Sequence, residues 1–518
     1  MHQLIKTKNS RWIVGITFLI FITIRLLFLS QHIYFGQDEA RDLLLSQRAL
    51  ANGVLIAGYG PKASVGDFYL PPFYYQLHRT VTAIFGTEPL VMHVVTLIID
   101  SLGAIILYFL LRLFFSRLSS LAGALVYAFS YQPFTQGVNS WNPNLIPVAT
   151  LALLYSCALG IVRSNWKFAW LAVLAFTISV HLHYQAIVLL PFLAWVFVKS
   201  IKPEFPWKSW AAGIVSSGII TLPYFVSEVR SNLANSRAII NYFQLEHHNY
   251  FDRIGKIEYV TKFIPQFFER VLAHEQLASG WLGLFLLFVG LMSVTFLMVK
   301  KRLYSLTFFL VYFGSVLLML RLYKGDKLDY YMSTLFILPA FVMASIIHAQ
   351  KHLGLVISVI VLGLSVNSII QLPPRNQINE LTNTIREIRS ISHSDSVRLL
   401  VHTDDFVNTL AFALPRYGEM SIDQSSLTVL EVFPKDRAPL QPSSFDSCAS
   451  SNTDSFTNSD YYEQFKKSSG FKPTKLIENP DFDILVGQLN CQPTPVKTHP
   501  LYQDQGFGSD LVVPNIYK

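Results

Sequence analysis

Charged residues are scarce in this sequence. They account for 14% of its 518 residues, whereas a soluble globular protein carries about 25%. Hydrophobic residues reach 52%, and the mean hydropathy is +0.38. This balance excludes an ordinary soluble globular protein and predicts a membrane protein.

Cysteine is also rare, with three residues in the whole chain. Cys157 lies in an apolar run, whereas Cys448 and Cys491 lie in a polar C-terminal tail. The last two could form a disulfide if the tail is outside the cytoplasm, but the sequence does not show whether they are close. The sequence therefore leaves the pairing of these two thiols open.

Apolar runs occur throughout the first 370 residues. A membrane-spanning helix needs roughly 20 mostly apolar residues. Apolar runs occur at 12–30, 88–111, 119–138, 144–162, 168–182, 186–199, 209–227, 281–299, 303–321, 332–350 and 353–370, of which the fifth and sixth are short. The first follows Lys6, Lys8 and Arg11 and has no small-residue cleavage site behind it, which indicates an uncleaved signal anchor. The sequence thus predicts a polytopic all-α membrane protein with about eleven transmembrane helices.

Lysine and arginine indicate which loops are cytoplasmic. If the N-terminus is cytoplasmic, every predicted inner loop is short and basic, and the net charge of +8 comes from these clusters rather than from a nucleic-acid-binding face. The outer segments are then 31–87, 139–143, 228–280, 322–331 and the tail from 371. We expect a multi-pass protein of the inner (plasma) membrane with lipids, and no nucleic acid, among its partners.

The C-terminal tail differs in composition from the rest of the chain. It is rich in Ser, Asn, Asp and Pro, and a helical pattern covers 379–389. Short apolar stretches typical of strands lie at 397–401, 427–433 and 482–486. We therefore expect a transmembrane domain over 1–370 and a small extracytoplasmic α/β or α+β domain over 371–518.

The first outer loop carries acids at helical spacing. Asp38, Arg41 and Asp42 are spaced i, i+3 and i+4, so a helix would present them on one face. One interpretation is a helix N-cap at Asp38 and a solvated face, and the other is a functional carboxylate. Downstream, Pro71-Pro72-Phe73-Tyr74-Tyr75 suits a chain that lies in the membrane interface and then turns into a helix.

Three short motifs, all on the predicted outer side of the membrane, resemble in their order and spacing those of the GT-C glycosyltransferases. They are the Asp38-Glu39 pair, the Pro-Pro-Phe-Tyr-Tyr segment and Asn142-Pro143-Asn144, which opens a span. The most similar group is the family of the protein O-mannosyltransferases and the lipid A aminoarabinose transferase, over roughly residues 10–350. The resemblance implies a polyprenyl-phosphate-linked sugar as co-substrate, Asp38 as catalytic base and Glu39 as its structural or substrate-binding neighbour.

This chemistry needs one carboxylate and a group of cations. A polyprenyl phosphate is a good leaving group, so no general acid is needed, in contrast to the two carboxylates of a glycosidase. One carboxylate takes the proton of the acceptor hydroxyl while this hydroxyl attacks the anomeric carbon from the opposite face. Cations hold the departing phosphate. We therefore expect transfer with inversion at the outer face of the membrane.

Basic residues in the outer segments are candidates for the phosphate contact. Arg321, Lys324 and Lys327 share one outer loop, against the usual distribution of bases, and could bind phosphate or pair with Asp326 and Asp329. Further candidate substrate contacts in these segments are Arg41, Lys62, Asp67, Tyr74, Tyr75, Arg79 and Tyr330.

Two polar breaks separate predicted spans. At one, His181, His183 and Tyr184 either line a wet cavity and hydrogen-bond a sugar or, with further ligands, bind a metal. At the other, Trp141 could stack on a sugar ring or anchor the interface, and Asn142 could bind the sugar or cap a helix. A divalent metal ion is therefore a possible cofactor, and no other cofactor is predicted.

Two charged residues lie inside the first two predicted spans. Arg25 and Asp100 would be costly in lipid, so we expect them to face the bundle interior and to pair with one another. The segment 228–280 mixes aromatic and charged residues, and we expect it to lie along the membrane surface over the cavity.

The leading hypothesis is a hexosyl- or pentosyltransferase whose acceptor is a protein, a lipid or a cell-envelope polysaccharide. A transporter or flippase for a lipid-linked or small substrate is the second, but the internal repeats usual in transporters are not evident. An envelope-assembly scaffold is the third. Replacement of Asp38 by Asn should abolish glycosyl transfer and leave the other two functions largely intact.

Overall fold

The chain forms two compact units in a computed structural model. Unit 1 comprises Met1–Ser30 and Val54–Pro374, and unit 2 comprises Gln31–Gly53 and Arg375–Lys518. The structure describes residues 8–63, 68–201, 204–244, 255–274, 279–323, 328–401, 407–422, 426, 428–434, 471–479 and 482–489. The first outer loop is therefore divided between the units, because its residues 31–53 fold with the C-terminal region.

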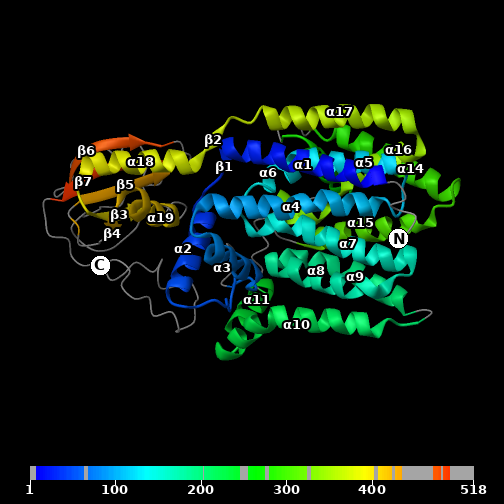
Figure 1. The fold of residues 1–518 in the computed structure, drawn as a ribbon, viewed down its shortest axis with the longest axis horizontal. Coiled ribbons are helices and arrows are strands. Elements are labelled where there is room, and N and C mark those ends of the chain that lie inside the picture. Colours follow the sequence, from blue (N-terminus) through cyan, green and yellow to red (C-terminus); the bar gives the residue numbers. More distant parts are fainter. Residues whose placement is uncertain are drawn as a thin grey trace. The chain divides into compact units, whose positions relative to one another are not determined.

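Unit 1 is built from helices, most of which run side by side (Figure 1). The longer ones are α1 (Lys8–Gln31), α3 (Phe73–Phe85), α4 (Pro89–Leu111), α5 (Arg117–Phe129), α7 (Ile146–Arg163), α8 (Ala169–Leu182), α9 (Leu190–Ser200), α10 (Trp207–Arg230), α11 (Ala234–Gln244), α14 (Trp281–Val299), α15 (Thr307–Leu322), α16 (Leu338–Ala349) and α17 (Lys351–Ile370). Shorter elements are α6 (Tyr131–Gln136), α12 (Lys256–Glu258), α13 (Ile264–Leu272), the 3-10 helices η1 (Asn142–Leu145), η2 (Trp166–Phe168), η3 (Tyr184–Leu189), η7 (Tyr304–Leu306) and η8 (Asp329–Leu335), and the π-helix η5 (Tyr259–Phe263). Several helices have proline in the first turn, where its missing N–H is not needed.

Seven helices of the described chain are long and apolar enough to cross a membrane. They lie at Pro89–Leu111, Asn142–Arg163, Trp207–Arg230, Trp281–Val299, Tyr304–Leu322, Asp329–Ala349 and Lys351–Ile370. Shorter apolar helices occupy Gly15–Gln31, Arg117–Phe129, Trp166–Leu182 and Tyr184–Ser200. All of these segments overlap predicted spans, and the full number of eleven stays a prediction. The predicted break near His183 is confirmed, because α8 ends at Leu182 and η3 begins at Tyr184.

The core of unit 1 centres on α16, which packs against α5, α14 and α17. Gly123 of α5 allows this close approach, since a Cβ there would lie 2.8 Å from the carbonyl oxygen of Ala340 on α16. Small residues let helix backbones pack closely where no water drives association. Aromatic rings fill the neighbouring layer, with the Phe309 and Phe341 centroids 4.4 Å apart.

The predicted pairing of Arg25 and Asp100 is confirmed. Arg25 Nη1 lies 2.9 Å from Asp100 Oδ2, and both side chains are buried. The same nitrogen donates to Ser101 Oγ at 2.8 Å, and Nη2 donates to two backbone carbonyls of α6 at 3.3 Å. Gly137 leaves room for the pair, because a Cβ there would clash with Arg25 Nη2 and Asp100 Oδ2. The pair thus ties α1 to α4 and α6.

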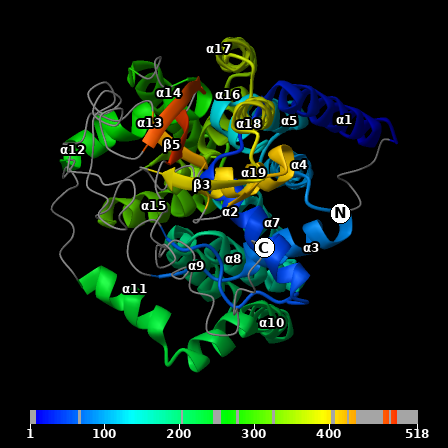
Figure 2. The same ribbon diagram turned by 90° about the vertical axis from the view of Figure 1, so that its left-hand side faces the viewer.

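Unit 2 contains a five-stranded sheet and a short parallel pair. The sheet has strand order β4-β3-β5-β7-β6. Its strands are β3 (Ser396–Val401), β4 (Ser421–Ile422), β5 (Thr428–Pro434), β6 (Phe471–Glu478) and β7 (Phe482–Leu489). Strand β3 pairs in parallel with β4 and β5, whereas β7 pairs antiparallel with β5 and β6. Helices α18 (Gln377–Ser392) and α19 (Val407–Gly418) pack against the sheet (Figure 2).

Residues 31–53 join this unit through backbone and side-chain contacts. Strand β1 (His32–Ile33) pairs in parallel with β2 (Arg375–Asn376). The backbone N–H of Phe35 donates to Gln377 Oε1 at 2.7 Å. Helix α2 (Gln37–Ala51) packs on α19, with the Phe35 and Phe412 rings 5.2 Å apart. The helix that carries Asp38 is therefore supported by α19, which lies more than 350 residues away in the sequence.

Candidate functional site

In unit 2, Asp38, Arg41 and Asp42 form one ion-pair network on α2. Arg41 Nη1 lies 2.5 Å from Asp38 Oδ1, and Arg41 Nη2 lies 2.8 Å from Asp42 Oδ1. The Asp42 side chain is fully buried, while that of Asp38 is 40% exposed. The predicted shared face is confirmed. The arginine holds two carboxylates, of which Asp38 is the more accessible to solvent.

The interpretation of Asp38 as the N-cap of this helix is wrong. The N-cap is Gly36, and α2 begins at Gln37, which places Asp38 inside the first turn. A glycine N-cap has no side chain to accept a hydrogen bond, so the cap depends on Glu39, whose Oε2 accepts from the Gly36 N–H at 3.1 Å. A carboxylate in the first turn is still favoured by the helix dipole.

Glu39 is 4% exposed and lies beside two other acids. Burial, together with the charges of Asp38 and Asp42, raises the pKa of Glu39 to about 8, against the opposing effect of its backbone hydrogen bonds. Glu39 therefore carries its proton near neutral pH. Because the Glu39 side chain accepts from the N–H of the N-cap residue Gly36, we interpret Glu39 as a structural neighbour of Asp38.

In unit 1, four aromatic side chains meet at the polar breaks between helices. Trp141 precedes η1, His183 separates α8 from η3, and Tyr330 and Tyr331 lie in η8. The ring of Tyr330 is 4.7 Å from that of Trp141 and 6.2 Å from that of His183, while Tyr331 lies 5.2 Å from His183. We call these four residues the aromatic cluster. The structure thus brings together Trp141, His183 and Tyr330, which the sequence identified separately.

Hydrogen bonds at the break orient His183. Its Nδ1 accepts from the backbone N–H of Gln185 at 3.4 Å, and Gln185 Nε2 donates to the Tyr331 carbonyl. Partial burial lowers the pKa of His183 to about 4. The imidazole is therefore neutral at pH 7 and carries its proton on Nε2, where it can donate to a sugar hydroxyl.

Arg270 is a candidate that sequence reasoning missed. Its Nε donates to both Asp329 oxygens at 3.0 Å, and its Nη2 lies 3.0 Å from Oδ1. Gln132 Nε2 adds a weaker contact to Asp329 Oδ2 at 3.4 Å. The sequence suggested partners for Asp329 within its own loop, but its partner is this arginine of α13. Asp329 directly precedes Tyr330 in η8, so Arg270 is tied to the element that carries two rings of the aromatic cluster.

The other predicted contacts have structural partners of their own. Asn142 Nδ2 donates to the Leu182 carbonyl at 2.6 Å, and His181 Nε2 lies 3.1 Å from Thr221 Oγ1. Tyr184 donates to the Tyr69 carbonyl at 2.9 Å. His181 and His183 therefore do not converge. Within the described residues, no three His, Cys, Asp or Glu side chains are grouped so that they could hold a metal ion.

The remaining candidates lie in the first and last outer segments of unit 1. Tyr74 and Tyr75 are buried, and Tyr74 donates to the Ser140 carbonyl at 2.6 Å. Lys62 forms an isolated β-bridge with Tyr69. Arg321 stacks over the Tyr259 ring at 5.7 Å, so its guanidinium faces η5. Outside the described residues lie Asp67, Lys324, Lys327, Cys448 and Cys491.

Residues 70–223 match the model of the family described as dolichyl-phosphate-mannose-protein mannosyltransferase. This segment is less than a third of the chain. It includes Tyr74, Tyr75, Trp141, Asn142, His181, His183 and Tyr184 and leaves out Asp38 and Arg270. No curated protein matches the sequence.

Several solved structures are similar in fold. ArnT from Cupriavidus metallidurans, bound to undecaprenyl phosphate, has 13% identity and a TM-score of 0.46, over 94% of this chain and 99% of that one. The oligosaccharyltransferase AglB from Archaeoglobus fulgidus, in complex with an inhibitory peptide and a dolichol-phosphate, has 12% identity and a TM-score of 0.49, over 81% and 70%. Arabinosyltransferase EmbB from Mycobacterium smegmatis has 10% identity and a TM-score of 0.39, over 76% and 34%.

Since these identities and TM-scores are low, the similarity to a known family depends on the sequence match over residues 70–223. It supports the resemblance seen in the motifs: residues 70–223 are similar to the family described as dolichyl-phosphate-mannose-protein mannosyltransferase.

Proposed function

We propose that the protein transfers a sugar from a polyprenyl-phosphate carrier to an acceptor hydroxyl at the outer face of the membrane, with inversion at the anomeric carbon. The observation that carries this proposal is the arrangement in unit 1, where Arg270 is paired with Asp329, the residue directly before Tyr330 of the aromatic cluster. Aromatic rings suit a sugar, and a guanidinium suits a phosphate. The matched family is described by a donor of this class.

Arg270 is suited to the phosphate because Asp329 orients it. Its Nε and Nη2 face Asp329, and within the described residues Nη1 has no such partner. The side chain is 16% exposed, so its charge acts in a medium of lower dielectric than water. Such a fixed cation stabilises the negative charge that the phosphate gains as the bond to the anomeric carbon breaks.

Asp38 is proposed as the base. The acceptor oxygen forms a bond to the anomeric carbon as the bond from that carbon to the phosphate oxygen breaks, and the hydroxyl proton passes to the Asp38 carboxylate. Arg41 orients this carboxylate through a 2.5 Å contact with Oδ1, and the 40% exposure of the Asp38 side chain leaves it accessible. Protonated Glu39 adds no negative charge to those of Asp38 and Asp42.

Further parts of the proposal concern the substrate contacts and the topology. We propose that Trp141, Asn142, His183 and Tyr330 contact the sugar, with further contacts from Lys62, Asp67, Tyr74, Tyr75, His181, Tyr184, Arg321, Lys324 and Lys327. We also propose that the four shorter apolar helices cross the membrane, which makes eleven spans in 1–370. The N-terminus is then cytoplasmic and residues 371–518 are extracytoplasmic. A divalent metal remains a proposal without a ligand group in the described residues.

Replacement of Asp38 by Asn tests the base. Purified protein is mixed with a membrane extract from cells that lack the gene, which supplies both the polyprenyl-phosphate sugars and the acceptor, and the release of free polyprenyl phosphate is measured by mass spectrometry. Asp395→Asn is the matched control, because Asp395 is also paired with an arginine, Arg389, at 2.7 Å, and is 91% exposed. We expect Asp38→Asn to lower the rate by about 100-fold or more and the control to leave it unchanged.

The same assay separates the alternatives. Glycosyl transfer by a well-folded Asp38→Asn protein would show that Asp38 is not the base. If the wild-type protein released no polyprenyl phosphate from any donor, and no lipid-linked sugar accumulated in cells without the gene, a transporter or scaffold would be favoured. Arg270→Gln should raise KM or lower kcat for the donor, whereas Arg270→Lys should retain part of the rate because it keeps the charge but not the bidentate contact with Asp329.

A further inference from the structure

A pocket of about 940 Å³ lies in unit 1 where six helical elements meet. It is bounded by the end of α7, by η2, by the end of α9, by the start of α10 and by the segment from η7 into α15. Helices α7 and α8 both lead from this pocket to the polar breaks at η1 and η3. The 18 residues of α7 make a helix about 27 Å long at 1.5 Å per residue, roughly the thickness of the bilayer core.

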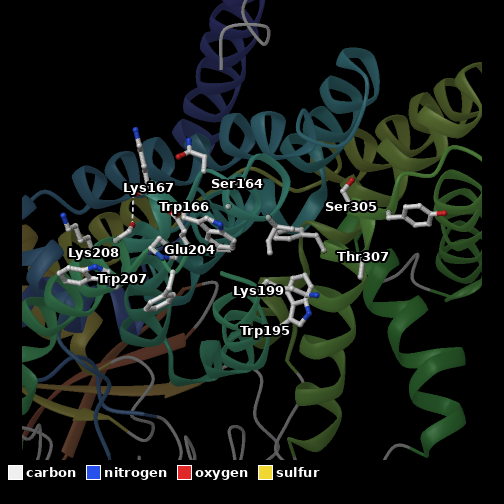
Figure 3. Close-up of a pocket in the computed structure, with 18 residues that line it drawn as sticks. Ser164, Trp166, Lys167, Trp195, Lys199, Glu204, Trp207, Lys208, Ser305 and Thr307 are labelled. Atoms are coloured by element: carbon white, nitrogen blue, oxygen red, sulfur yellow. Dashed lines mark hydrogen bonds between the residues drawn. The ribbon is translucent and has the colours of Figure 1, made fainter. Parts of the chain in front are cut away.

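Three lysines on three different elements line the pocket (Figure 3). Lys167 comes from η2, Lys199 from α9 and Lys208 from α10. All three are exposed, and none makes an ion pair within the part of the chain that the structure describes. Glu204 is the one acid among the described lining residues. The pocket therefore carries a net positive charge.

Hydroxyl and amide groups accompany the lysines. Those among the lining residues are Ser164, Asn165, Ser209, Tyr304, Ser305 and Thr307. One of them is already used, because Ser209 Oγ donates to the Lys167 carbonyl at 3.1 Å. Neutral donors next to lysines form the usual surroundings of a bound phosphate. The polar side of the pocket is therefore suited to a phosphate group.

Aromatic rings form the apolar side of the pocket. Trp195, Trp207 and Phe205 line it together with Trp166, whose ring packs against Gly160 so closely that a Cβ there would clash with it. Lys199 Nζ lies 5.9 Å from the Trp195 ring, and Lys208 Nζ lies 5.9 Å from the Trp207 ring. Tryptophan beside lysine at the ends of apolar helices is typical of the depth where lipid headgroups meet the acyl chains.

We propose that this pocket binds an anionic membrane lipid, with its phosphate among Lys167, Lys199 and Lys208 and the start of its chains against the tryptophans. A soluble phosphate compound would use the lysines but not the aromatic side, whereas a lipid uses both. The distribution of bases places the pocket on the predicted cytoplasmic side. It is thus a second lipid-phosphate site, separated from the aromatic cluster by the length of α7.

Lipid titration of the delipidated full-length protein in a neutral detergent, followed by native mass spectrometry, tests this site. The ligands are phosphatidylglycerol, a polyprenyl phosphate and, as the uncharged comparison, phosphatidylcholine. The pocket variant is Lys167→Ala/Lys199→Ala/Lys208→Ala. The matched control, Lys300→Ala/Lys301→Ala/Lys351→Ala, removes three exposed lysines from the same predicted side that do not line the pocket. The three Lys→Arg substitutions in the pocket serve as the conservative variant.

The wild-type protein should bind at least one of the two anionic lipids about tenfold or more tightly than phosphatidylcholine, and the stronger of the two identifies the source of the phosphate. The pocket variant should lose about 10- to 100-fold of that affinity, on the scale of the attraction of a few lysines to an anionic lipid. The control and the arginine variant should bind like the wild type. Equal losses in the pocket variant and the control, or displacement of the lipid by millimolar inorganic phosphate, would overturn the proposal. Glycosyl transfer is not part of this readout, so the result does not depend on the proposed function.

Discussion

The buried pair of Arg25 and Asp100 allows a quantitative test of how unit 1 is held together. Arg25→Met leaves a buried carboxylate without its cation, and Asp100→Leu leaves a buried guanidinium without its anion. The double variant Arg25→Met/Asp100→Leu removes both charges and fills the space with apolar atoms of similar size.

The expected magnitudes follow from burial. Arg25 is 0% and the Asp100 side chain 4% exposed, at a distance of 2.9 Å. Removing one partner of such a pair costs about 3–5 kcal/mol, whereas replacing both by apolar groups is often nearly neutral. Arg25 also loses its bonds to Ser101 and two carbonyls in the first variant, so Arg25→Met should be the more damaging single change. The double variant should be more stable than either single variant.

The assay is equilibrium unfolding of the detergent-solubilised protein by titrated denaturant, followed by tryptophan fluorescence. The double-mutant cycle gives the coupling between the two residues as the difference between the double variant and the sum of the single variants. Gly137→Ala is an independent probe, because its Cβ would push into Arg25 and Asp100 without removing either charge. Ser101→Ala, which removes one hydrogen bond, should cost only about 1 kcal/mol.

Additive single effects would refute this reasoning. They would mean that the two side chains do not interact in the folded protein and that each is satisfied separately. A Gly137→Ala protein with wild-type stability would likewise show that the space around the pair is larger than the structure indicates.

Three further predictions concern other buried groups. The pKa of Glu39 is raised from 4.5 to about 8, so between these pH values the folded state keeps a proton that the unfolded state loses. The free energy of unfolding should therefore fall as the pH rises from about 4.5 to 8. Unfolding measurements at several pH values should show that Glu39→Gln removes this slope. Glu228 is 2% exposed and accepts hydrogen bonds from Tyr59 and from Ser236. Glu228→Ala should therefore lower the free energy of unfolding of unit 1 by about 1–3 kcal/mol in denaturant titrations. Wild-type stability of this variant would show that water replaces the carboxylate. Phe412→Ala removes the ring against Phe35 and should cost about 3–5 kcal/mol in the unfolding of unit 2; an unchanged transition would contradict the packing of α2 on α19.

Periodicity and charge placement predicted much of unit 1 because they depend on local sequence. The apolar runs that became α4, α7, α10, α14, α15, α16 and α17 need only length and composition to be recognised. The break at His183 was visible because polar residues interrupt an apolar pattern. The partnership of Arg25 and Asp100 followed from the cost of an isolated charge in lipid, which leaves each residue few alternatives.

Residues that act through distant partners could not be found in this way. Arg270 is one of many arginines in the sequence, and only the fold places it against Asp329. The N-cap at Gly36 was missed because an acid in the first turn has the same spacing as an acid at the cap. The pocket lysines were read as markers of cytoplasmic loops, and their common pocket appears only when α7, α9 and α10 are brought together.

The sequence by itself determined that this is a helical membrane protein and which segments are apolar enough to cross the bilayer. It also determined that its motifs resemble those of the GT-C glycosyltransferases. These conclusions were accessible because hydropathy, charge and short motifs are local properties of the sequence. The tertiary structure decided which side chains meet. It joined Trp141, His183 and Tyr330 into one cluster, gave Arg270 its carboxylate, and supported the helix of Asp38 on a C-terminal unit. These contacts depend on the packing of segments far apart in the chain, which no local pattern encodes.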